Sequence, residues 1–184
     1  MLSKPAQNRL IRLAQKYLDK TPNQDRAGAY SRFFKLSESI GIKTSWSGEE
    51  YTVELYERAR KCHAIGCGPY VFGLFYHVDY GICFLVELVP VFNALSARNP
   101  KTYEGNEFFH YNSSHYWERE TRLGKMVNHL IRKLHYKANF SFNDAHGGNI
   151  AYKRGQVLVI DFDQFHTYNN TELANRKLLP KAKV

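Results

Sequence analysis

The sequence has few cysteines, no long apolar segment and no dense run of charge of one sign. Its three cysteines, Cys62, Cys67 and Cys83, lack the number and spacing of a disulfide framework. Cys62, His63 and Cys67 could form half of a zinc site, but no second pair of ligands follows at a useful distance. We therefore expect reduced thiols. Apolar residues make up 43% of the 184 residues and aromatic residues 15%, which excludes a disordered chain.

Membrane-spanning and secretory signals are also missing. The longest apolar run, residues 82–89, is interrupted by Glu87 and is much shorter than the roughly 20 residues that cross a bilayer. The first ten residues, MLSKPAQNRL, contain no apolar core of a secretory signal. These features predict a cytoplasmic protein without a membrane partner. The net charge of +9 favours an anionic partner, such as a nucleotide, a nucleic acid or an acidic protein.

Hydrophobic periodicity predicts a β-rich first half that follows an N-terminal helix. Residues 5–20 carry apolar side chains at helical spacing, namely Leu10, Leu13, Ala14, Tyr17 and Leu18. Two hairpins are then predicted, 32–36 with 39–43 and 70–77 with 81–88. Between them a helix is predicted from Ser47, as N-cap, to about Cys62.

The second half has a different pattern. Residues 100–115 are polar and aromatic without periodicity, which is typical of a loop, and residues 116–137 form a long amphipathic pattern. A last hairpin is predicted from 150–152 with 157–160. The order of elements predicts an α+β protein of two lobes, with a β-rich part followed by an α-rich part.

Two short stretches carry the residues on which a chemical function would depend. Residues 142–150 read F-N-D-A-H-G-G-N-I, and residues 157–163 read V-L-V-I-D-F-D. Phosphoryl transfer requires a carboxylate that orients the nucleophile, oxygen ligands for magnesium, and a cation near the phosphates. Asp144 and Asn149 lie five positions apart, and Asp161 ends an apolar strand about a dozen residues later. The pattern therefore fits a metal-dependent phosphotransferase site, although Asp, Asn and Gly also favour ordinary turns.

This combination resembles the catalytic loop and metal-binding strand of the protein-kinase-like superfamily. The D-x-H-x-G-N form is similar to aminoglycoside and choline phosphotransferases, I-D-F-x-Q resembles RIO kinases, and residues 141–150 resemble the early protein kinases of T-odd coliphages. The resemblance implies that Asp144 is the catalytic base and that Asn149 and Asp161 bind metal. His146 takes the place of a phosphate-contacting lysine, and Asp163 is either a second metal ligand or a polar strand end.

Further parts of the chain resemble other motifs of this superfamily in the expected order. Residues 27–35 resemble an incomplete glycine-rich loop, which contains Gly28, and the strand after it. G-I-K at 41–43 resembles the strand that carries the phosphate-binding lysine, here Lys43. Glu54 is the predicted ion-pair partner of Lys43, with Glu50 and Glu57 as alternatives on the same helical face. Residues 84–90 resemble a hinge strand, and the resemblance implies that the backbone from Glu87 to Val89 binds adenine.

The fold implied by this resemblance is bilobal and covers the chain as one kinase-like domain. Residues 1–89 would form the N-lobe with an N-terminal helix, and residues 90–184 a much shortened helical C-lobe. Only 23 residues follow Asp161, so we expect no activation segment, and acceptor recognition would involve residues 100–115 or the basic surface.

The implied function is an ATP- and Mg²⁺- or Mn²⁺-dependent kinase that acts on Ser or Thr of proteins. A phage origin would place it in the host cytoplasm, acting on host proteins. Two alternatives remain: a small-molecule phosphotransferase, and a pseudokinase-like module that binds and inhibits a partner.

Overall fold

The computed structural model describes residues 2–20, 22, 26–27, 31–90, 122–142, 148–163 and 165–167, with only the backbone described at 26–27, 122–124 and 166–167. The elements in chain order are α1 (Lys4–Leu18), β1 (Arg26–Ala27), β2 (Ser31–Lys35), β3 (Ile40–Ser45), α2 (Glu49–Ala64), β4 (Val71–His77), β5 (Gly81–Glu87), α4 (Arg122–Lys133), η2 (Leu134–Ala138), β6 (Phe140–Phe142), β7 (Ile150–Lys153), β8 (Gln156–Val159) and β9 (Phe165–Thr167). Gly28, Asp144, His146 and residues 100–115 lie outside the described residues.

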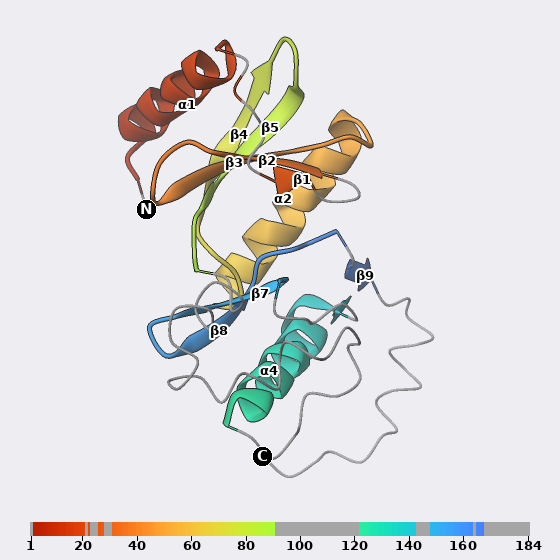
Figure 1. Ribbon diagram of the computed structural model, residues 1–184. Helices are drawn as coiled ribbons and strands as arrows, with labels where there is room; N and C mark the ends of the chain where they lie inside the picture. Colours follow the sequence, from red (N-terminus) through yellow and green to blue (C-terminus); the bar gives the residue numbers. More distant parts are fainter. Residues whose placement is uncertain are drawn as a thin grey trace.

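A five-stranded antiparallel sheet forms the first half of the chain. Its strand order is β1-β2-β3-β5-β4, so β3 lies at the centre. Both predicted hairpins are confirmed, because β2 pairs with β3 and β4 pairs with β5 (Figure 1). The short polar segment between β2 and β3 and the Val78-Asp79-Tyr80 turn between β4 and β5 reverse the chain as the pattern predicted.

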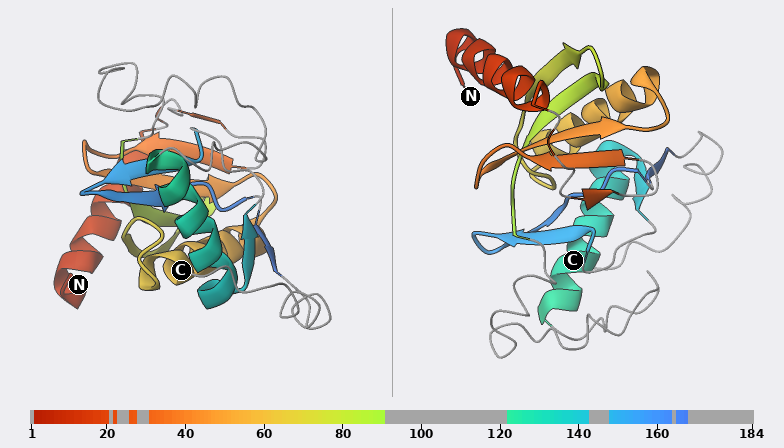
Figure 2. Two further views of the ribbon diagram at one scale, coloured as in Figure 1. Left: turned by 90° about the horizontal axis from the view of Figure 1, so that it is seen from below. Right: turned by 45° about the horizontal axis from the view of Figure 1, so that its top comes forward.

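The two faces of this sheet are covered by different helices, as Figure 2 shows. Side chains alternate along a strand, so successive residues of β5 enter different layers of the protein. Cys83 and Leu85 pack in a cluster with Leu18 of α1, whereas Phe84 and Val86 pack in another cluster with residues of α2. The sheet is therefore buried on both sides.

The N-terminal helix is confirmed as α1, and its apolar face contacts β4 and β5. Ala14 and Leu18 are fully buried, but Leu13 is 52% exposed, because it lies beyond the edge of the stripe that meets the sheet. Two glutamines of α1 also bond to the backbone of β4: Gln7 Nε2 donates to Phe72 O, and Gln15 Nε2 donates to Tyr76 O at 3.0 Å.

The predicted helix after β3 is confirmed as α2, but its N-cap is Gly48 and not Ser47. Ser47 N–H donates to Ser45 Oγ at 3.0 Å, which keeps Ser47 in the turn before the helix. Gly48 has φ = 101°, a value that residues with a side chain rarely adopt. Thr52, at the end of the first turn, accepts from Ser45 N–H and so ties α2 to β3.

The second half consists of α4 with its π-helical extension η2 and two small antiparallel pairs, β6-β9 and β7-β8. The predicted last hairpin is confirmed as β7-β8, and the predicted long helix begins at Arg122 in the described residues. The β6-β9 pair was not predicted. It is held by contacts among the rings of Phe140, Phe142, Phe162 and Phe165.

One hydrophobic core joins the two halves. It contains Leu55 of α2, Phe84 of β5, Leu134 of η2 and Val159 of β8, all fully buried. In addition, Val159 N–H donates to Cys67 O at 2.8 Å, between β8 and the turn after α2. The mixture of helices with antiparallel strands confirms the α+β class.

The three cysteines are free and buried, and burial raises the pKa of each thiol, that of Cys83 to about 11. Such thiols are poor nucleophiles and poor metal ligands at neutral pH. No helix among the described residues is both long and apolar enough to cross a membrane.

Candidate functional site

Lys43 extends from the centre of the sheet toward α2. It pairs with Phe84 of β5 in register, and directly opposed residues share a face, so its side chain leaves the sheet on the α2 side. On the other side it is opposed by Phe33, whose ring lies across Gly41, where a Cβ would come within 2.3 Å of it. Lys43 is only 8% exposed. A buried ammonium requires an acidic partner, and the structure provides two.

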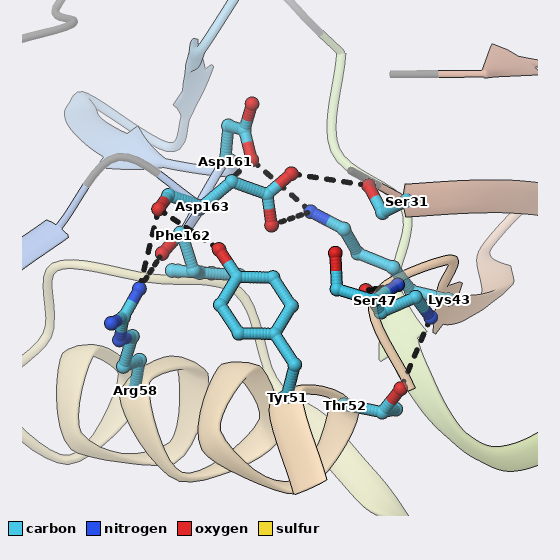
Figure 3. A network of polar contacts seen from close by, with 10 residues as sticks. Ser31, Lys43, Ser47, Tyr51, Thr52, Arg58, Asp161, Phe162 and Asp163 are labelled. Atoms are coloured by element: carbon cyan, nitrogen blue, oxygen red, sulfur yellow. Dashed lines mark hydrogen bonds and ion pairs between the residues drawn. The ribbon is translucent and has the colours of Figure 1, made fainter. Parts of the chain in front are cut away.

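The partners are the two aspartates that follow β8. Lys43 Nζ lies 3.1 Å from Asp161 Oδ1 and 3.7 Å from Asp163 Oδ1 (Figure 3). Residues two apart in extended chain point the same way, so both carboxylates face the sheet while Phe162 enters the core, where it is 1% exposed. The apolar run 157–160 and the buried Phe162 thus place two acids under Lys43.

The two aspartates respond differently to this environment. Burial acts to raise the pKa of Asp161. The positive charge of Lys43 and the hydrogen bonds that Lys43 Nζ and Asp163 N–H donate to Asp161 outweigh burial, so the pKa of Asp161 lies below its usual value. Burial also raises the pKa of Asp163, where the charge of Lys43 is opposed by that of Asp161, and the net result is a raised pKa. Asp161 is therefore the more firmly ionised of the two.

Asn149 lies beside Asp161 across the β7-β8 pair. The ladder pairs Ile150 with Val159, and Ile160 N–H donates to Asn149 O at 2.9 Å. Asn149 is 7% exposed and makes further interactions of its own. The backbone of Asn149 thus pairs with the residue that precedes Asp161, although Asn149 and Asp161 are 12 positions apart in the sequence.

The side chains of this site have the chemistry, though not a demonstrated geometry, of ligands for a hard divalent cation. Asp163 Oδ1 is buried and accepts no hydrogen bond, and its cationic partner Lys43 Nζ stays 3.7 Å away, beyond hydrogen-bonding distance, so this oxygen has a coordination position that a metal ion could take. Carboxylates and an amide are the ligands that Mg²⁺ and Mn²⁺ take in phosphate-binding sites. The described residues contain no cluster of three or more His, Cys, Asp or Glu that could hold a metal. The fit therefore depends on the combination of Asp161, Asp163 and the amide of Asn149.

Glu54 does not pair with Lys43, which corrects the predicted partner. Its carboxylate instead accepts from Arg58 Nη2 at 2.5 Å, one helical turn further along α2, and remains 53% exposed. Of the two alternatives, Glu57 pairs with Arg60, and Glu50 has no ion pair with Lys43. In this structure the charge of Lys43 is balanced by the aspartates after β8.

The backbone of the hinge-like segment is largely engaged within the protein. Glu87 N–H donates to Tyr70 O and Leu88 N–H donates to Ser39 O, so both are used within the protein. The Glu87 carboxylate pairs with Lys153 of β7 and accepts from Tyr70 N–H. Within the described part of the chain no hydrogen bond engages the backbone of Val89. Binding of adenine there stays a prediction.

Three residues around the aspartates were not predicted. Ser31 Oγ donates to Asp163 Oδ2 at 3.2 Å, and Tyr51 and Arg58 of α2 donate to backbone carbonyls next to Asp163 (Figure 3). Burial and the Asp163 charge raise the pKa of Tyr51, so its hydroxyl remains a donor at neutral pH. The helical spacing of Tyr51, Glu54 and Arg58 could have indicated one polar face directed at a common target.

A separate cavity of about 720 Å³ lies between α4 and the β7-β8 turn. Its floor includes Cys67, Leu130 and Val157, and none of the predicted site residues lines it. The candidate site is therefore identified by its network of polar contacts, and this cavity is not part of it.

No protein-family model matches the sequence, and no curated protein is significantly similar to it. The geometry of the described residues is therefore the basis for a functional proposal.

Proposed function

We propose that this protein is an ATP- and Mg²⁺-dependent phosphotransferase with a bilobal, kinase-like arrangement, and that it phosphorylates Ser or Thr of proteins. The observation that carries the proposal is the ion pair between Lys43 Nζ and Asp161 Oδ1, 3.1 Å apart and 118 positions apart in the sequence. It brings together a buried cation from the sheet and the aspartate expected to bind metal, as the resemblance implies.

Each residue has a chemical task in this proposal. Bound Mg–ATP supplies the transferable phosphoryl group and the cation that offsets its charge. Asn149, Asp161 and Asp163 would hold the metal, and Lys43 would contact the phosphates. Asp144, which lies outside the described residues, takes the proton of the acceptor hydroxyl as that oxygen bonds to phosphorus and the bond to ADP breaks. Val89 would bind the adenine.

The arrangement of the chain supports a site between the two halves. The five-residue segment 143–147 contains Asp144 and His146, and both of its flanks are tied to the segment that carries Asp161. Phe142 pairs with Phe165 in β6-β9, and Asn149 O accepts from Ile160 N–H. Gly28, the residue of the predicted phosphate-binding loop, precedes Ser31, which contacts Asp163.

The test begins with nucleotide binding and then measures transfer. We expect ATP with Mg²⁺ to raise the melting temperature, because a ligand that binds only the folded state stabilises it by mass action. Labelled ATP and a bacterial lysate should give labelled protein bands. Asp144→Ala should lower transfer by about 10²–10⁴-fold while retaining the thermal shift. Asp161→Asn should reduce both readouts.

The matched control is Asp79→Ala, which removes an exposed aspartate from the β4-β5 turn. It should leave transfer and the thermal shift unchanged. Labelled small metabolites in place of labelled proteins would identify a small-molecule phosphotransferase. A thermal shift without transfer would identify a nucleotide-binding pseudokinase, and the absence of both would overturn the proposal.

A further inference from the structure

The α2 helix directs hydrogen-bond donors at two successive backbone carbonyls after β8. Arg58 Nη1 donates to Phe162 O at 2.9 Å and to Asp163 O at 3.3 Å. Tyr51 Oη donates to Asp163 O at 3.2 Å. Figure 3 shows both side chains rising from α2 toward the same turn of the chain. These residues contact the backbone and not the carboxylates, so their effect is on the path of the chain.

Arg58 is itself held in place. Its other terminal nitrogen, Nη2, donates to Glu54 Oε1 at 2.5 Å, and its side chain is only 13% exposed. A guanidinium group is planar and can donate to several acceptors at fixed angles, which an ammonium group cannot do. Glu54 therefore orients Arg58, and Arg58 transmits that orientation to the backbone.

The carbonyls that Arg58 holds belong to the turn on which both aspartates depend. Asp163 N–H donates to Asp161 Oδ1 at 3.2 Å, so the two residues are linked within the turn. The peptide planes at Phe162 and Asp163 determine where the flanking side chains point. A rotation of these planes would move both carboxylates relative to Lys43.

We propose that Arg58 is a positioning residue which, with Tyr51, fixes the turn at residues 161–163 so that both carboxylates converge at Lys43. The geometry of the site is thereby set through α2. Glu54 then serves as the residue that orients Arg58, which gives it a role other than pairing with Lys43. The significance of this device for metal and nucleotide rests on the proposed function, but the contacts can be tested without it.

The first test measures amide hydrogen exchange of residues 161–163 in the full-length protein. Arg58→Met keeps the aliphatic stem but removes the donors, and exchange should accelerate by about 10-fold, as expected from the loss of charge-assisted hydrogen bonds. Arg58→Lys should restore little of the protection because it lacks the planar group. The control, Arg60→Met, removes a 56% exposed guanidinium from the same helix and should leave exchange unchanged.

A second test uses chemical rescue. Glu54 and Arg58 line a groove of about 500 Å³ along α2, so truncation at position 58 leaves a space that solvent can reach. In Arg58→Ala, millimolar guanidinium chloride should slow the exchange of residues 161–163 again and should lower the Mg²⁺ concentration required for half-maximal transfer. Sodium chloride at the same ionic strength should do neither.

Tyr51→Phe covers the case in which the Arg58 variants do not fold. It removes one hydroxyl, keeps the ring, and should accelerate exchange at Asp163 by about fivefold, the effect of losing one neutral hydrogen bond.

The outcomes separate the two proposals. Accelerated exchange in a protein without phosphate transfer supports the positioning role and rejects the kinase activity. Normal exchange and unchanged Mg²⁺ dependence in folded Arg58→Met, in an active enzyme, reject the positioning role alone.

Discussion

At the level of single residues, one ammonium group is shared by two carboxylates with opposite pKa directions. Asp161 is closer to Lys43 and has a lowered pKa, whereas Asp163 is nearly buried and has a raised pKa. An aspartate with a lowered pKa in the folded state adds stability above its unfolded pKa and loses it as the pH falls through the folded pKa. An aspartate whose pKa is raised in the folded state has the opposite effect. The free energy of unfolding falls as the pH rises from the pKa in the unfolded state to the pKa in the folded state.

These signs predict opposite effects of two similar substitutions at neutral pH. Asp161→Asn should destabilise the protein by about 1–3 kcal/mol, because a hydrogen-bonded ion pair is lost. Asp163→Asn should stabilise it by about 1 kcal/mol, because burial and the charge of Asp161 outweigh the attraction of Lys43 for the ionised Asp163, and a neutral amide removes that net cost. Urea denaturation as a function of pH measures both.

The pH dependence provides the internal control. The advantage of Asp163→Asn should disappear as the pH falls below 3.8, the ordinary value for aspartate, where the wild-type group is protonated in both states. A stabilisation that does not change with pH would contradict the assignment.

The sequence could place Lys43 in a strand and Asp161 just after one, because both belong to hairpins with clear patterns. It could not select the partner of Lys43. Glu50, Glu54 and Glu57 share one helical face, and Arg58 and Arg60 lie within one turn of Glu54 and Glu57. Local helical pairs compete for these two glutamates, and that competition is decided by packing that a linear pattern does not contain.

At the level of elements, α1 is part of the core and not an appendage on the surface. Its buried stripe contains Ala14 and Leu18, which pack with β3, β4 and β5, whereas Leu13 points to solvent. The apolar periodicity predicted the helix correctly but overestimated the width of the buried face. Only contact with a sheet determines which edge of an amphipathic stripe is covered.

Leucines of α1 that differ in burial should differ in their contribution to stability. Leu18→Ala should lower the free energy of unfolding by about 2–5 kcal/mol, because a fully buried side chain leaves a cavity. Leu13→Ala should change it by less than about 0.5 kcal/mol. Urea midpoints of the two variants provide the comparison, and equal losses would mean that α1 does not dock as described.

At the level of the whole molecule, the continuous core predicts that the two halves unfold together. Val159 of β8 is fully buried in the cluster that includes Phe84 of the sheet, and its N–H bonds to the turn after α2. A protein with one such core is expected to unfold in a single transition.

Val159→Ala should therefore lower the stability of the sheet as well as that of β8. We expect a loss of about 1–3 kcal/mol. The fluorescence of Trp46, which stacks under Arg32 at the sheet, measures unfolding of the sheet. Trp117→Phe removes the other tryptophan so that only Trp46 contributes to the signal. Far-UV circular dichroism should give the same midpoint. Two separate transitions, with the Trp46 signal unaffected, would show that the halves are independent.

The chain order of helices and hairpins was readable from the sequence because each hairpin combines alternation with a clear turn. The β6-β9 pair was not, because three-residue strands are too short to show a period and their partners are separated by 22 residues in the sequence. The position of the predicted catalytic loop lies outside the described residues, so Asp144 and His146 stay predictions.

The two glutamines of α1 have a consequence for self-association. β4 is one of the two outer strands of the sheet, and the side chains of Gln7 and Gln15 bond to its carbonyls at Phe72 and Tyr76. An outer strand with free carbonyls is a template on which another chain can add a strand. α1 therefore shields the sheet border from intermolecular β-pairing, and its detachment would favour aggregation even if every other element remained folded.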